Sequence, residues 1–180
     1  MTPKKIMMSL WDFLLPQPSK STKTQMKVRL AKTQTKVRPI QAKYDAIVEQ
    51  MKQTYGFRIR KWRSSMSGCA WELKDRQGNI SRLVESPYPK GPMSCAIFLH
   101  EVGHHAIGFH VYKPRCLEEY YAWAWSIEAM KANGVRVTDG VLKRQDDSLR
   151  YALAKALRRG LKKIPLELMQ YAPLHLRNAS

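Results

Sequence analysis

The chain has 180 residues, of which 44% are hydrophobic and 26% charged, and its 32 lysines and arginines against 14 acidic residues give a net charge of +18. Wholesale disorder is excluded because the chain holds enough apolar material for a core, and the length predicts one domain with tails. The three cysteines form no CxxC pair, which argues against a disulfide framework and predicts a cytoplasmic protein.

The beginning of the chain carries much of the positive charge. Residues 1–43 contain ten lysines and arginines but one acidic residue, Asp12. The apolar stretch at residues 6–15 is too short to span a bilayer and has no signal-peptide cleavage site after it, so we expect no stable membrane insertion. We expect residues 1–38 to form a basic, flexible arm. Its spaced cations suit a nucleic-acid backbone, and the candidate ligands are Lys27, Arg29, Lys32, Lys36 and Arg38.

The next segment predicts a helix followed by a small sheet. Apolar residues recur at helical spacing over residues 40–51, and Gly56 is a typical helix stop. Short apolar segments then predict strands at residues 57–61 and 69–73, and the turn sequence DRQGN leads into a third strand at residues 80–85. We expect these strands to form a three-stranded meander.

The rest of the chain predicts three helices, at about residues 95–108, 117–133 and 142–163. The order of the elements predicts an α+β domain over residues 39–165, followed by a C-terminal tail over residues 166–180. A second basic cluster near the C-terminus, at helical spacing in the last predicted helix, adds candidates for nucleic-acid binding, namely Lys155, Arg158, Arg159, Lys162 and Lys163.

Four of the five histidines lie within eleven residues, and His100-Glu101-Val102-Gly103-His104 has the H-E-x-x-H pattern on a predicted helix. Helix positions i and i+4 share a face, so both imidazoles reach one metal ion. Glu101 lies where it contacts a metal-bound water as a general base. Neutral imidazoles suit Zn²⁺, whose bound water becomes nucleophilic near neutral pH. The pattern predicts one zinc ion per chain, with His100 and His104 as ligands and Glu101 as the catalytic base.

A catalytic zinc needs a third protein ligand, and the sequence offers three candidates. His110 has the position of the last histidine in H-E-x-x-H-x-x-G-x-x-H, but Ile107 stands where that motif has its glycine. Glu119 shares a predicted helix face with small residues that would let its helix approach the histidine helix closely. Glu118 lies on a neighbouring face and stays an alternative.

These residues resemble the ImmA/IrrE-like metallopeptidases, which are small gluzincin-type proteins. The likeness covers about residues 38–135 and rests on HEVGHH at residues 100–105 and EEYYA at residues 118–122. It implies a zincin-like fold and cleavage of a protein partner, often a DNA-bound repressor, or regulation without proteolysis. Trp123 departs from the family pattern, which commonly has Asn or Asp there. Carried over by position, the ligands are His100, His104 and Glu119, and the base is Glu101.

A peptidase must also stabilise an oxyanion and align its substrate. The strand predicted at residues 80–85 is a candidate to pair with an extended peptide. The candidate oxyanion stabilisers are His110, Tyr112, Tyr120 and Tyr121.

The sequence supports two functions of different classes. The first is a zinc-dependent metalloendopeptidase that hydrolyses peptide bonds of a protein partner and is recruited to DNA or RNA by its basic flanks. The second is a nucleic-acid-associated or ribonucleoprotein component whose metal site is structural or vestigial.

Overall fold

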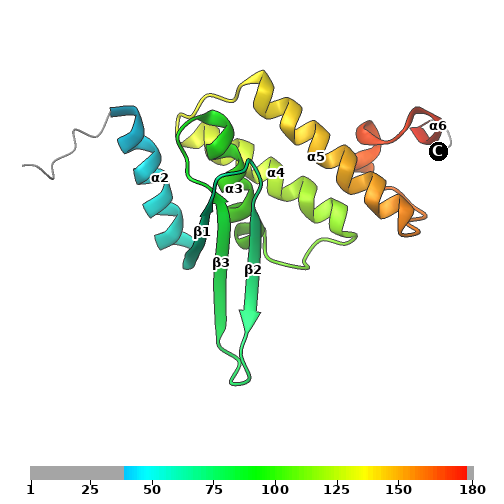
Figure 1. The fold of residues 1–180 in the computed structure, drawn as a ribbon. Helices are drawn as coiled ribbons and strands as arrows, with labels where there is room; N and C mark the ends of the chain where they lie inside the picture. The colour runs from blue at the N-terminus through cyan, green and yellow to red at the C-terminus, as the bar shows by residue number, and fades with distance from the viewer. Residues whose placement is uncertain (1–38, 178–180) are drawn as a thin grey trace, which may run out of the picture. The chain divides into compact units, whose positions relative to one another are not determined.

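The computed structural model describes residues 39–177 (Figure 1). The expected basic arm at residues 1–38, with its candidate nucleic-acid ligands Lys27, Arg29, Lys32, Lys36 and Arg38, lies outside the described residues, as do residues 178–180. The described part is α+β and combines helices with a three-stranded mixed sheet. Within residues 39–177, no helix is both long and apolar enough to cross a membrane.

Along the described residues, one helix is followed by three strands and then by helices alone. In order, the elements are α2 (Pro39–Tyr55), β1 (Phe57–Arg63), β2 (Cys69–Lys74), β3 (Ile80–Pro87), α3 (Pro92–Ile107), α4 (Arg115–Ala132), α5 (Asp139–Arg158), the 3₁₀ helix η2 (Leu166–Tyr171) and α6 (Leu174–Arg177).

The sheet is not the expected meander. Strand β3 lies at its centre, parallel to β1 and antiparallel to β2. The last four residues of β3 are buried, whereas the second half of β2 is exposed. The most buried strand therefore takes the position where both edges are paired, because unpaired backbone groups are costly away from water. The expected pairing of a peptide along residues 80–85 is wrong, since residues 82–85 of β3 are already paired on both sides.

Helix α3 lies at the centre of the described domain and packs against β3, α2, α4 and α5 (Figure 1). Every residue from Ser94 to His105 is buried. A helix that is apolar on most faces is stable only when other elements cover it on all sides. Its histidines and Glu101 are therefore buried polar groups that need partners inside the domain.

The described segment after α5 is folded onto the same core. Helix α5 ends at Arg158, earlier than the expected residue 163, because Gly160 adopts a left-handed conformation with φ of 90°. Leu168 and Ala172, in the segment expected as a tail, are fully buried in the hydrophobic core.

Candidate metal centre

The candidate metal ligands lie where α3 and α4 approach most closely. Gly103 faces the backbone of Ala122, and a Cβ at position 103 would stand 2.7 Å from the Ala122 carbonyl oxygen. One turn further along α4, the Ser126 hydroxyl donates a hydrogen bond of 2.9 Å to the Ala96 carbonyl. Small residues on both helices thus allow the two backbones to approach. This is the packing expected from the small residues that share a face with Glu119.

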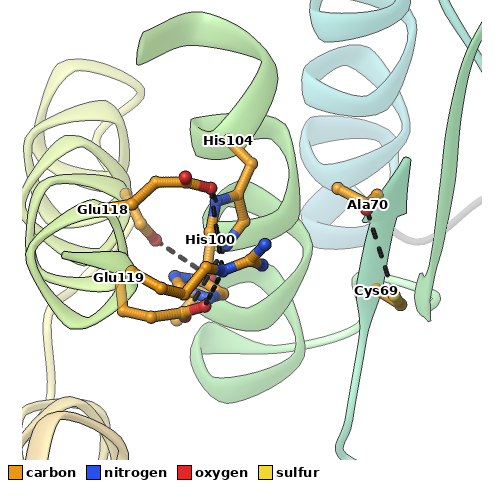
Figure 2. A network of polar contacts seen from close by, with 9 residues as sticks. Cys69, Ala70, His100, His104, Glu118 and Glu119 are labelled. Atoms are coloured by element: carbon orange, nitrogen blue, oxygen red, sulfur yellow. Dashed lines mark hydrogen bonds and ion pairs between the residues drawn. The ribbon is translucent and has the colours of Figure 1, made fainter. Parts of the chain in front are cut away.

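His100, His104 and Glu119 direct one ligand atom each to a common point (Figure 2). Glu119 Oε2 lies 3.4 Å from His100 Nε2 and 3.7 Å from His104 Nε2, and the three ligand atoms lie within 4.8 Å of one another. Ligands of a tetrahedral ion with bonds of about 2.0–2.1 Å stand roughly 3.3 Å apart. This group could therefore hold a metal ion with small side-chain adjustments.

Glu118 orients His104 from behind and does not point at the common site. Its Oε1 lies 3.1 Å from His104 Nδ1, and its Oε2 accepts a hydrogen bond of 3.2 Å from the His110 backbone N–H. In the tautomer whose Nδ1–H donates to Glu118, His104 Nε2 presents its lone pair toward Glu119. His110 is exposed, and it does not belong to the group formed by His100, His104 and Glu119. Of the three candidate third ligands, Glu119 is the one whose oxygen lies near the Nε2 atoms of both histidines.

His100 is positioned by an aromatic contact instead. The ring of Trp123 stacks on it, with centroids 4.5 Å apart and planes inclined by 26°. His100 Nδ1 is buried and has no hydrogen-bond partner among the described residues. Trp123 stands where the resembling family commonly has Asn or Asp. The two histidines are thus held by different means, a carboxylate for His104 and a ring face for His100.

The carboxylates around the site favour a proton on His104 when no ion is bound. Burial would lower the pKa of His104, but hydrogen bonds to Glu118 and Glu119 raise it to about 9. Burial also raises the pKa of Glu119, yet the hydrogen bonds from His100 and His104 outweigh it and hold this pKa well below its usual range. A metal ion that bound here would have to displace the proton of His104, because only a neutral imidazole ligates a metal.

Glu101 follows His100 on α3 and faces the same opening as the candidate ligands. Burial raises the pKa of its carboxyl, and the charges of His100 and His104 oppose this only in part. Gly68, just before β2, is packed against it, since a Cβ at position 68 would clash with the Glu101 carboxylate. A desolvated carboxylate beside a metal site has the properties of a general base. The sequence does not predict the contact with Gly68, because it shows only a glycine in a turn at that position.

A cleft of about 890 Å³ opens onto these residues. Cys69 and Ala70 of the edge strand β2 lie on one side of it, and residues of α5 lie on another. The cleft also contains Arg115, whose Nε donates a hydrogen bond of 3.3 Å to Glu119 Oε1. This contact leaves Glu119 Oε2 directed at the histidines. The sequence gives no sign of this role, because Arg115 belongs to no recognisable motif.

The expected oxyanion stabilisers lie elsewhere. Tyr112, Tyr120 and Tyr121 do not line the cleft. The rings of Tyr112 and Tyr121 stack with centroids 4.1 Å apart, and the Tyr121 hydroxyl donates a hydrogen bond of 2.9 Å to Glu167. Of the second basic cluster, Lys155 and Arg159 line the cleft, whereas Arg158, Lys162 and Lys163 are exposed outside it.

Replacement of Glu118 by Gln is expected to weaken zinc binding by about tenfold or more. The amide lacks the negative charge that supports His104. Its NH₂ group must also face either His104 Nδ1 or the His110 backbone N–H, where a carboxylate oxygen accepted a hydrogen bond. A competition titration with a chromophoric chelator measures the change. Glu128→Gln is the matched control, because Glu128 is an exposed glutamate of the same helix. Unchanged affinity in Glu118→Gln would show that Glu118 does not support the site.

Comparison with known proteins identifies no relative: no protein family, curated protein or solved structure matches the chain. The geometry of the site therefore carries the functional argument.

Proposed function

We propose that the protein is a zinc-dependent metalloendopeptidase with a zincin-like domain. The observation that supports this most strongly is the convergence of His100, His104 and Glu119, with Glu101 beside them in an open cleft. Two imidazoles and one carboxylate form a donor set typical of catalytic zinc, which leaves a fourth position for water or substrate. Ca²⁺ and Mg²⁺ prefer sites made only of oxygen ligands.

In this proposal the groups in the cleft divide the work of peptide hydrolysis. Zinc supplies a Lewis acid that makes water nucleophilic near neutral pH. Glu101 accepts the proton of the attacking water and delivers it to the leaving amine. Arg115 takes the role of oxyanion stabiliser in place of the tyrosines, because its positively charged side chain is 59% exposed and lines the cleft.

The edge strand β2 is the element that fits an extended peptide. Its pairing with β3 uses one edge, and Cys69 and Ala70 at its start line the cleft. An extended substrate that adds to the free edge would pass beside the ligand group with its backbone hydrogen bonds satisfied. This replaces the pairing that the sequence predicted for residues 80–85.

Metal removal tests the proposed function. We expect the purified protein to contain one zinc ion per chain and to cleave peptides in a proteome-derived mixture, as detected by mass spectrometry. Treatment with 1,10-phenanthroline should abolish cleavage, and added zinc should restore it. A protein without stoichiometric metal, or cleavage that survives chelation, contradicts the proposal. Zinc binding with no cleavage would instead favour the second hypothesis, a nucleic-acid-associated component with a structural or vestigial metal site.

A further inference from the structure

One wall of the cleft carries positive charge. The residues of α5 and its C-cap that line the cleft recur every three or four positions, so they form one stripe along the helix. The basic members of this stripe stand toward its two ends. The stripe consists of Arg144, Asp147, Ser148, Tyr151, Ala152, Lys155, Ala156 and Arg159.

The cations at the C-terminal end of this stripe are not neutralised. Lys155 and Arg159 are exposed, and neither forms an ion pair within residues 39–177. Two other cations of the helix are paired, since Lys143 Nζ lies 3.0 Å from Asp147 Oδ2 and Arg150 Nε lies 2.7 Å from Asp146 Oδ2. Uncompensated cations on the wall of a cleft raise the local concentration of an anionic ligand.

The spacing of these cations suits a peptide. Lys155 and Arg159 are four residues apart, which is about 6 Å along a helix axis. Side chains on one face of an extended chain repeat every second residue, or roughly 6.6 Å. Two acidic side chains at alternate positions would therefore lie opposite the two cations, where charge-assisted hydrogen bonds form.

Other charges in the cleft favour a peptide over a nucleic acid. Glu101 and Glu119 lie at the metal site, and Asp147 lies on the α5 wall. A continuous phosphate backbone would place negative charge against these carboxylates along its whole path. A peptide carries negative charge only at its acidic side chains, so it can place neutral residues beside the carboxylates of the cleft.

We propose that the cleft selects acidic segments of protein substrates, with Asp or Glu at alternate positions held by Lys155 and Arg159. This inference rests on the proposed peptidase function and adds the substrate class to it. The neighbouring Arg158 and the paired Lys143 do not line the cleft, so they take no part in this selection.

The test compares two short fluorescein-labelled peptides that differ only in acidic residues at alternate positions, replaced by their amides in the second peptide. Binding to the zinc-loaded full-length Glu101→Gln protein is measured by fluorescence anisotropy at about 0.15 M salt, where long-range attraction is screened. We expect the acidic peptide to bind roughly five- to tenfold more tightly. Lys155→Gln/Arg159→Gln in this background should remove most of the preference. Lys143→Gln/Arg158→Gln has the same net charge and should keep it.

Three results would overturn the inference: equal binding of the two peptides, equal losses in the two double variants, or tighter binding of a short oligothymidylate that depends on Lys155 and Arg159. The last result would assign these cations to nucleic acid.

A failure of the proposed peptidase function would be seen separately. If wild-type protein never cleaves the acidic peptide although Lys155 and Arg159 bind it, the acidic preference stands and the peptidase proposal falls. If wild-type protein cleaves both peptides equally well and binds them equally, only the preference falls.

Discussion

Replacement of Glu101 by Gln is expected to lower kcat for peptide hydrolysis by about 10²- to 10⁴-fold, while the protein still binds one zinc ion. Glutamine has nearly the same shape but cannot accept the proton of the attacking water. Glu101 is not one of the three residues whose ligand atoms converge, so the ligand set stays intact. Steady-state cleavage of a peptide identified in the proteome-derived mixture gives kcat, and elemental analysis of the same sample gives the zinc content.

The folding stability of the zinc-free Glu101→Gln protein should stay the same or rise. Burial raises the pKa of Glu101, which means that the folded state disfavours its charged form. An uncharged amide avoids that penalty. Glu72→Gln serves as the control, because Glu72 lies on β2 and does not line the cleft. If Glu101→Gln cleaves at the wild-type rate, Glu101 is not the base; if it loses zinc, Glu101 belongs to the ligand set.

The features that the sequence predicts well are those fixed by local geometry. His100 and His104 share a face because they are four residues apart on one helix, whatever surrounds it. The turn between β2 and β3 was predictable for the same reason, since Gly78 donates to the Asp75 carbonyl within a few residues. The α+β class follows from the order of such local elements.

The choice between Glu118 and Glu119 depends on a contact between two helices. Both residues lie in the first turns of α4, and either reaches α3 for some rotation of α4 about its axis. The contact of Ala122 with Gly103 sets that rotation, placing Glu119 at the common site and Glu118 behind His104. The small residues in the sequence indicated that the face of α4 with Glu119 packs against α3. They could not show that Glu118 would contact His104 from the other side.

The tyrosines show how proximity in sequence misleads. Successive helix residues are rotated by about 100°, so a neighbour of a ligand usually faces elsewhere. Tyr121 follows Glu119 by two positions and points toward η2, where Glu167 accepts its hydrogen bond. Arg115 precedes Glu119 by one full turn and therefore reaches it. The strand order and the approach of Gly68 to Glu101 depend on pairings between distant segments, which the local pattern does not contain.

Replacement of Gly103 by Ala is expected to destabilise the protein by about 1–3 kcal/mol and to weaken zinc binding by at least about tenfold. In an isolated helix the same change would stabilise by about 1 kcal/mol, because alanine is the better helix former. Here the added Cβ would stand 2.7 Å from the Ala122 carbonyl oxygen and 3.3 Å from the Ala122 Cα. These are backbone atoms, so α4 as a whole must move, and Glu119 moves with it.

Gly140→Ala is the matched control for this change. Gly140 also lies in a helix, but a Cβ there would meet Met93 Cε at 3.7 Å, which is ordinary contact. We expect this variant to be as stable as wild type or slightly more stable, with unchanged zinc affinity. Thermal unfolding and a zinc titration on both variants separate helix propensity from helix approach. If Gly103→Ala were as stable and bound zinc as tightly as Gly140→Ala, the close packing of α3 on α4 could not be what brings Glu119 to the histidines.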